Sequence, residues 1–246
     1  MKLVKVPGVN GLGKTKGTRD FGDLIVDKFD YVLELNNDNV EEQQAKIYDK
    51  ADEYLHEPLG VIFVGGDHSI SYPSAKAFFD KYGHGKLIVF DAHPDCMPFM
   101  KEPTHEEWLR ALVEQGVRGD DILLIGARKI EPEEGEFLNL SGIRTISVDQ
   151  VRFDLGKSLR WVREFVRQGE IYVSFDIDVF DSSIVKATGY PESGGLNETE
   201  VSRLLEVIKE GNVVAGDLVE GNVDFPKEDV VETVRVARGV LDKLGK

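Results

Sequence analysis

The chain of 246 residues contains a single cysteine, Cys96, so no disulfide can form within it. Secreted proteins commonly rely on disulfides, whereas reducing compartments keep thiols free. A lone cysteine beside an acidic side chain is most often a packing residue, and we expect no catalytic role for Cys96. These observations exclude a disulfide-stabilised scaffold and are consistent with a reducing compartment.

Long apolar segments are also absent. The longest apolar runs, such as residues 87–90, are four residues long, whereas a membrane-spanning helix needs about 20 apolar residues. The first 17 residues contain lysines but lack the apolar centre of a signal peptide. We therefore expect a soluble, cytoplasmic protein with no membrane partner.

Basic residues are outnumbered, with 30 Lys and Arg against 45 Asp and Glu, which gives a formal charge of −15. Nucleic acids and anionic membranes bind basic surfaces, so this charge argues against both. It suits a cationic small molecule, although an acidic surface often serves solubility alone. No linker tract, repeat or low-complexity segment divides the chain, and we predict one domain spanning residues 1–246.

One strand-like apolar run, residues 87–90, leads directly into three side chains that commonly bind metals. Asp91, His93 and Asp95 occupy alternate positions, and alternate side chains of an extended chain point to the same face. Two carboxylates and an imidazole on one face suit a divalent cation. The alternative for this stretch alone is a solvated polar loop.

Two other strand-like runs end in the same kind of side chain. Asp176 and Asp178 follow the run that begins at Ile171, and His68 lies just beyond residues 61–64. Neighbouring ionised carboxylates repel each other unless a cation neutralises them. Four carboxylates with two neutral imidazoles balance the charge of two divalent ions. The sequence therefore predicts a two-metal site with six ligands: His68, Asp91, His93, Asp95, Asp176 and Asp178.

The motifs GGDHS, DAHPD and SFDIDVFD, in this order, resemble the metal-binding motifs of the ureohydrolases, the arginase and agmatinase family. The segments TGYPESGGL (188–196) and DLVEGN (217–222) agree with the same family. The resemblance extends from about Gly65 to Asn222 and is weak in the N-terminal quarter. It implies a homo-oligomeric hydrolase with two manganese ions per chain, and manganese is also favoured by the hard carboxylate ligands.

The resemblance also implies how the ligands are shared and what the ions do. Two ions lower the pKa of a shared water, which supplies hydroxide near neutral pH. The hydroxide would attack the carbon of a guanidinium group, and the products would be urea and an amine. By resemblance, one ion is held by His68, Asp91, Asp95 and Asp176, and the other by His93, Asp91, Asp176 and Asp178.

Two functional residues are expected outside the ligand set. Glu220 corresponds to the guanidinium-binding glutamate of the family, and a carboxylate suits the planar fork of a guanidinium. His105 is placed in the first turn of a helix, because Thr104 and Glu107 have capping-box spacing. Resemblance to agmatinases makes His105 the candidate for handling a proton or orienting the substrate. An ordinary surface position is the alternative for both residues.

Three residues near the motifs lie outside the ligand set. Asp67 and Asp181 are expected to brace the site through hydrogen bonds, and Ser182 stands where the family usually has proline.

The loop after the DAHxD motif bears on the substrate. Arginases bind the α-carboxylate of their substrate with small polar residues in this loop, whereas residues 96–100 are apolar here. The sequence therefore favours agmatine, or another guanidine with an apolar or cationic tail, over free arginine.

Two rival functions remain open. Residues 8–15 match the phosphate-loop pattern GxxxxGKT, which would indicate a nucleotide hydrolase. That loop binds phosphate only where a helix begins at its Lys-Thr pair, and Gly17 and Gly22 weaken a helix here by about 1 kcal/mol each relative to Ala. The second rival is a non-catalytic homologue that binds metal without hydrolysing a substrate.

Strand-like and helical patterns alternate along the chain. Strands are predicted at residues 2–6, 31–35, 61–64, 87–90, 122–125, 143–147, 171–174 and 213–219. Helices are predicted at 39–57, after 104, around 133–140, at 157–168, from 197 and at 226–243. The alternation fits an open sheet or a closed barrel. The family resemblance implies a three-layer α/β/α sandwich with a central, mainly parallel sheet of about eight strands.

Overall fold

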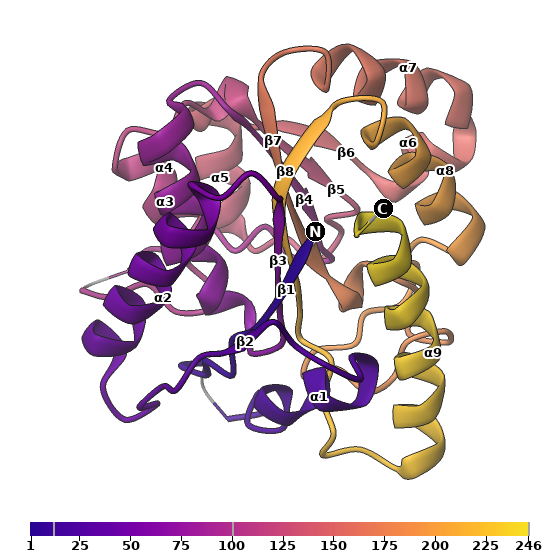
Figure 1. Ribbon diagram of the computed structural model, residues 1–246. Coiled ribbons are helices and arrows are strands. Elements are labelled where there is room, and N and C mark those ends of the chain that lie inside the picture. Colours follow the sequence, from indigo (N-terminus) through magenta and orange to yellow (C-terminus); the bar gives the residue numbers. More distant parts are fainter. Residues whose placement is uncertain (12, 100, 246) are drawn as a thin grey trace.

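Eight strands form one sheet in the computed structural model, which describes residues 1–11, 13–99 and 101–245 (Figure 1). Their order across the sheet is β2-β1-β3-β8-β7-β4-β5-β6, and every pairing is parallel. The strands are β1 Lys2–Lys5, β2 Tyr31–Val32, β3 Val61–Val64, β4 Lys86–Phe90, β5 Ile122–Ile125, β6 Arg144–Ile146, β7 Glu170–Asp176 and β8 Asn212–Val219. All eight predicted strands are present, and β2 is shorter than predicted.

Helices cover both faces of the sheet (Figure 1). One face is covered by α2 Val40–Leu55, α3 Ser71–Tyr82, α4 Trp108–Glu114 and α5 Pro132–Ser141. The other face is covered by α1 Thr18–Ile25, α6 Val148–Phe153, α7 Leu155–Phe165, α8 Glu198–Ile208 and α9 Lys227–Leu244. The three-layer sandwich is therefore confirmed, and the barrel is excluded because β2 and β6 are open edges. None of the described helices is long and apolar enough to cross a membrane.

The central strands are apolar on both sides because helices cover both faces of the sheet. Leu87 and Val89 of β4 pack into the core beneath α2 and α3, whereas Ile88 and Phe90 pack into the core on the opposite face. All five residues of β4 are buried. Burial on both faces fixes where the strand ends, and so fixes where Asp91 enters the site.

The prediction that glycines prevent a helix after the glycine loop was wrong. Helix α1 begins at Thr18 and includes Gly22, because Phe21 and Ile25 are buried in the core. A methyl group at Gly22 would lie 3.4 Å from Phe29 and 3.6 Å from Val64. Tertiary packing of the apolar face thus outweighs the helix-weakening effect of glycine.

The predicted start of the helix near His105 was also wrong. Helix α4 begins at Trp108, and His105 lies in the turn before it. The Glu107 carboxylate accepts hydrogen bonds from the backbone N–H of Thr104, at 2.7 Å, and from its hydroxyl. The capping-box residues therefore close a turn that precedes the helix.

Candidate metal centre

The predicted ligands come from the carboxyl ends of adjacent central strands. Strands β3, β8, β7 and β4 are neighbours in the sheet. His68 begins a 3₁₀ turn shortly after β3, and Asp91 directly follows β4. Asp176 is the last residue of β7, and Asp178 lies in the following 3₁₀ turn, Ile177–Val179. Parallel strands present their carboxyl ends at one edge, so residues distant in sequence meet there.

The first cluster surrounds the imidazole of His68. Its Nδ1 atom lies 2.9 Å from Asp95 Oδ2, 3.0 Å from Asp91 Oδ2 and 3.3 Å from Asp176 Oδ2. All four side chains are buried. One imidazole nitrogen therefore faces three carboxylate oxygens in a site that excludes bulk water.

The second cluster surrounds His93. Its Nδ1 atom lies 2.9 Å from Asp178 Oδ2 and 3.5 Å from Asp91 Oδ1. Asp91 thus turns one carboxylate oxygen toward each cluster, the arrangement expected of a bridging ligand. Among the described histidines, Asp176 contacts His68, and its other oxygen accepts a hydrogen bond from the Asp178 N–H at 2.8 Å. A bridging role for Asp176 stays a prediction.

The chemistry of these side chains fits a divalent cation. Among the described residues, His68 Nδ1 and Asp91 Oδ2 are buried without a hydrogen-bond partner, and an unpaired buried polar atom costs about 1–3 kcal/mol. The other ring nitrogen of His68 contacts Ser174 Oγ at 2.9 Å, and Ser174 Oγ lies 2.8 Å from an Asp217 oxygen. This support orients Nδ1 toward the carboxylates, as in metal sites whose outer residues fix the ligand.

Protons and cations compete for the carboxylates. Burial, together with the charge of Asp91, raises the pKa of Asp95 to about 7. Burial and the charges of Asp178 and Asp91 also raise the pKa of Asp176. Burial alone would lower the pKa of His68, but contacts with the three carboxylates raise it well above its usual value. A metal ion must therefore displace protons from this cluster.

Asp95 and Glu220 are the non-glycine residues with positive φ in the described chain, at 51° and 66°. This conformation is strained for residues with a side chain and often occurs at functional sites. Asp95 is held by Trp108, whose Nε1 donates to Oδ2 at 2.8 Å, and by the N–H of Leu109, which donates to its carbonyl at 3.2 Å. The start of α4 thus fixes a candidate ligand in a strained conformation.

Glu220 follows β8 and lines a cavity of about 60 Å³ together with His68, His93 and Asp176. Its Oε1 accepts a hydrogen bond from the His68 N–H at 2.9 Å. Its Oε2 is buried and has no partner among the described residues. Burial and the nearby carboxylates raise the pKa of Glu220 well above its usual value. A cationic group in the cavity would favour the ionised form.

His105 is buried and lines the same cavity. Its Nε2 lies 3.5 Å from Glu106 Oε1, and its ring centroid lies 5.6 Å from that of Tyr190. A side chain at Gly11 would overlap the His105 ring, so the glycine loop packs directly against the histidine. The structure places His105 in the cavity wall and not at the exposed surface.

Residues 8–15 do not present a phosphate cradle in their described part, which excludes Leu12. The Asp67 carboxylate accepts hydrogen bonds from the N–H groups of Asn10, at 2.9 Å, and Gly11, at 2.6 Å, and lies 3.2 Å from Thr15 Oγ1. An acidic group thus occupies the amides that a phosphate would need. Helix α1 begins three residues after Thr15. Asp67 acts as the expected brace, and what it braces is the loop over His105.

Asp181 braces a second loop. Its carboxylate accepts hydrogen bonds from the N–H groups of Gly194, at 2.6 Å, Gly195, at 3.1 Å, and Ser183, at 2.9 Å. These bonds close the loop of residues 181–195, which contributes Tyr190 to the cavity wall.

Three cavity-lining residues were not identified from the sequence as parts of the site: Glu106, Thr188 and Tyr190. The TGYPESGGL segment was the available signal for Thr188 and Tyr190. None of the described residues of the apolar loop after Asp95, 96–99, lines this cavity. Cys96 is fully buried in the core, and Met100 lies outside the described residues. The preference for agmatine over free arginine that this loop suggested stays a prediction.

A parallel α/β/α sandwich whose central strands end in carboxylate and histidine clusters is an α/β protein with a candidate metal centre. The model of the Arginase family matches residues 10–244, and the chain belongs to this family.

Individual relatives agree with this assignment. The agmatinase of Pyrococcus horikoshii is 36% identical, over 66% of this chain and 55% of its own length. The arginase of Eremothecium gossypii is 32% identical, over 71% of this chain and 50% of its own. The chain thus spans about half the length of these curated relatives. The structure of proclavaminate amidino hydrolase from Streptomyces clavuligerus superposes with a TM-score of 0.90 at 21% identity, covering 98% of this chain and 89% of that one, which supports the fold.

Proposed function

We propose that this protein hydrolyses a guanidino group to urea and an amine, using two manganese ions per chain. The observation that carries the proposal is the pair of clusters that share Asp91 beside one cavity. Bound ions of this kind make a water molecule acidic enough to supply hydroxide near neutral pH. The ions would be held by the six residues His68, Asp91, His93, Asp95, Asp176 and Asp178.

Glu220 would bind the guanidinium of the substrate. Its Oε2 atom is buried beside the cavity without a partner in the described structure. A carboxylate and a guanidinium form paired, charge-assisted hydrogen bonds. Binding the cation would ionise Glu220 and hold the reacting carbon beside the clusters.

His105 would give a proton to the leaving amine. The amine departs with the electron pair of the broken C–N bond and needs a proton to become a good leaving group. His105 lies in the wall of the same cavity as Glu220, and its Nε2 lies 3.5 Å from the Glu106 carboxylate.

An agmatinase-like substrate is supported by Glu106. This residue lines the cavity, and its side chain is 53% exposed, which places a carboxylate at the solvent side of the site. A cationic tail would be attracted to this carboxylate, whereas the carboxylate of free arginine would be repelled. Lys14, whose Nζ lies 5.5 Å from the centre of the Tyr190 ring, favours a second candidate, a guanidino acid with an anionic tail.

Urea release from a panel of guanidines tests the function. Metal-free protein would be loaded with manganese, and urea would be measured with agmatine, 4-guanidinobutyrate and arginine. We expect two manganese ions per chain by metal analysis and the highest kcat/KM with agmatine. Highest activity with 4-guanidinobutyrate would favour the Lys14 candidate. A single tightly held zinc ion would contradict the two-metal site, and two ions without urea from any guanidine would indicate the non-catalytic homologue.

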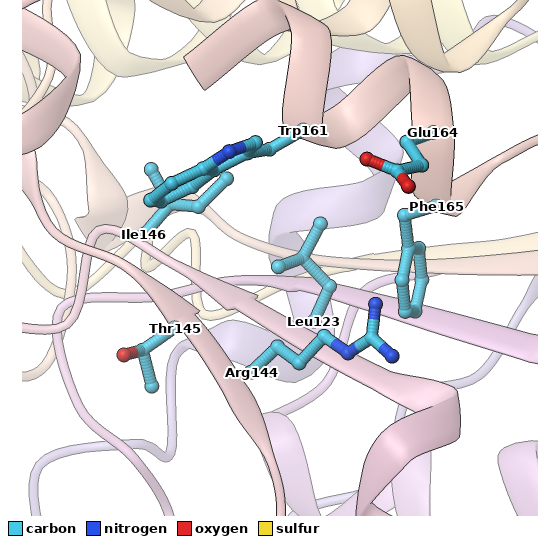
Figure 2. A pocket seen from close by; sticks show the side chains of 7 residues that line it. All are labelled: Leu123, Arg144, Thr145, Ile146, Trp161, Glu164 and Phe165. Atoms are coloured by element: carbon cyan, nitrogen blue, oxygen red, sulfur yellow. The ribbon is translucent and has the colours of Figure 1, made fainter. Parts of the chain in front are cut away.

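We further propose that the protein is a cytoplasmic homo-oligomer acting as a single domain. Support for self-association comes from exposed apolar side chains on elements that flank the edge strand β6. Leu140 at the end of α5 is 80% exposed, and Phe153 at the end of α6 is 95% exposed. A hollow of about 330 Å³ lies beside β6. In Figure 2, Trp161 and Phe165 of α7 face Arg144 and the neighbouring apolar residues Leu123 and Ile146. Exposed apolar surface of this kind is typical of interfaces.

Phe153→Asp should weaken self-association by about 10-fold to 100-fold, since a buried apolar contact contributes roughly 1–3 kcal/mol. Sedimentation velocity over a concentration series would measure the change against the 27.5 kDa monomer. Val231→Asp is the matched control, because Val231 is also exposed but lies on α9. An unchanged assembly in Phe153→Asp would show that this residue does not lie in an interface.

A further inference from the structure

Arg128, which follows β5, makes an unusual set of hydrogen bonds. Its guanidinium donates to backbone carbonyl oxygens in the turn after β7 and in the loop that Asp181 closes. The acceptors are Asp178 O at 2.9 Å, Val179 O at 3.3 Å, Phe180 O at 3.1 Å, Glu192 O at 2.8 Å, Ser193 O at 3.0 Å and, beside Arg128 itself, Gly126 O at 3.3 Å. Arg128 is half-buried, so several of these carbonyls depend on it in place of water.

These carbonyls need donors because the segment that carries Asp178 is a single 3₁₀ turn, Ile177–Val179. The last carbonyls of a helical turn have no partner within the turn. A guanidinium offers five N–H donors in a rigid, planar fork, whereas a lysine offers three donors on one nitrogen. Arginine can therefore fix several carbonyls at once and, with them, the backbone position of Asp178.

Arg128 also connects this turn to the other half of the second cluster. Its backbone N–H and that of Lys129 donate to the carbonyl of Ala92, at 2.9 and 3.0 Å. The N–H of Ala92 in turn donates to Asp178 Oδ1 at 3.0 Å. Ala92 lies between Asp91 and His93, so Arg128 joins the two segments that supply the second cluster.

The first cluster is supported mainly by other residues, and its direct link to the turn that Arg128 fixes is the hydrogen bond from the Asp178 N–H to Asp176 Oδ1, at 2.8 Å. The His68 ring contacts Ser174, which is backed by Asp217, and Asp95 is held by Trp108. None of these contacts involves Arg128. Loss of its guanidinium should therefore affect the two clusters unequally.

We propose that Arg128 is a positioning residue that sets the affinity of the cluster formed by His93, Asp178 and Asp91 for its metal ion. The proposal rests on the two-metal function proposed above. The charge of Arg128 repels cations and by itself weakens metal binding. Its favourable effect is therefore geometric, and a substitution that keeps the charge separates the two effects.

Arg128→Lys keeps the positive charge and removes the planar guanidinium with its five N–H donors. Manganese would be titrated into metal-free protein by calorimetry, so that two affinities are measured within one molecule. We expect the affinity for one manganese ion to fall by about 10-fold to 100-fold, the usual cost of losing a residue that orients a metal ligand. The affinity for the other manganese ion should stay within about twofold. The spin-coupled signal of a manganese pair in electron paramagnetic resonance should weaken at equal added metal.

Arg152→Lys is the matched control. Arg152 also donates to the loop, at Gly195 O, but it has no contact with the turn that carries Asp178 among its described hydrogen bonds. Both affinities should be unchanged in this variant. If Arg128→Lys does not fold, Arg128→Gln is titrated in its place. Glutamine has two side-chain N–H donors and no charge. Loss of the positive charge by itself favours cation binding, so a lower affinity in this variant would also be geometric.

The outcomes separate the two proposals. Unchanged affinities in Arg128→Lys, or an equal loss of both, would overturn the positioning role while leaving two ions in the unsubstituted protein. Uptake of a single ion by the unsubstituted protein would instead contradict the two-metal site, and the role of Arg128 would fall with it.

Discussion

Removing manganese with a chelator should lower the unfolding temperature by roughly 15–30 °C at pH 8 and by only a few degrees at pH 5. A ligand present at about 1,000 times its dissociation constant stabilises a protein by about 4 kcal/mol, so two ions contribute about 8 kcal/mol. For a chain of this size, 1 kcal/mol corresponds to about 2–4 °C. Calorimetric scans with and without chelator at both pH values would measure the difference.

The pH dependence follows from the buried carboxylates. In the metal-free protein, burial raises the pKa of Asp95 from 3.8 to about 7. A raised pKa in the folded state stabilises the fold below pH 3.8, and this contribution is lost as the pH rises from 3.8 through 7. The metal-free protein should therefore be least stable at pH 8, where its buried carboxylates are ionised. Bound cations would stabilise the protein most at this pH, because they neutralise these carboxylates. At pH 5, protons already occupy the site and little metal binds.

Asp176→Asn is the companion variant for this experiment. It removes one carboxylate charge from the first cluster. The chelator should therefore lower the unfolding temperature of this variant at pH 8 by much less. Asp181→Asn is the control, because Asp181 hydrogen-bonds loop amides and belongs to neither cluster. A chelator effect of equal size at pH 5 and pH 8 would contradict competition between protons and metal.

His105→Asn should lower kcat by about 10²-fold to 10⁴-fold while KM and the content of both metals stay nearly unchanged. Asparagine has a similar reach but cannot deliver a proton at neutral pH, and general acid catalysis is worth this factor. Steady-state kinetics and metal analysis of the same preparation would measure the three quantities. His84→Asn is the matched control, since the His84 side chain is 80% exposed and does not line the cavity.

Glu220→Gln should give a different kinetic pattern. Removing the charge that holds the guanidinium weakens the ground state and the transition state together, so KM rises and kcat falls as well. Full turnover by His105→Asn would show that the amine receives its proton from another group. An unchanged KM in Glu220→Gln would show that the guanidinium is held elsewhere.

Local chemistry explains why the sequence predicted so much of the candidate site. An apolar run that ends in alternating carboxylates has the period of a strand, and the repulsion between its acidic groups indicates a cation. Asp91, His93, Asp176 and Asp178 are recognisable by this pattern alone. His68 was recognisable as a candidate ligand from the glycine turn that precedes it. Its assignment to the same site as the other motifs came from the family resemblance.

The errors have a common physical origin. Helix α1 forms because Phe21 and Ile25 are buried by other elements, and this burial outweighs the glycines. The turn at His105 also depends on packing with a distant segment, because Gly11 lies against the His105 ring. Helix propensity is a property of one segment of the sequence, whereas tertiary packing depends on which other segments contact it.

The sequence by itself determined the strand and helix alternation, the identity of the six ligand candidates and the order of their motifs. The tertiary structure decided which strands are neighbours, and the order β3-β8-β7-β4 brings His68, Asp91 and Asp178 to one edge of the sheet. It also divided the two oxygens of Asp91 between the clusters and placed Arg128 against the turn of Asp178. Ligand chemistry can be read from the residues themselves, but distances between remote segments arise only when parallel pairing and two-sided burial fix every strand end.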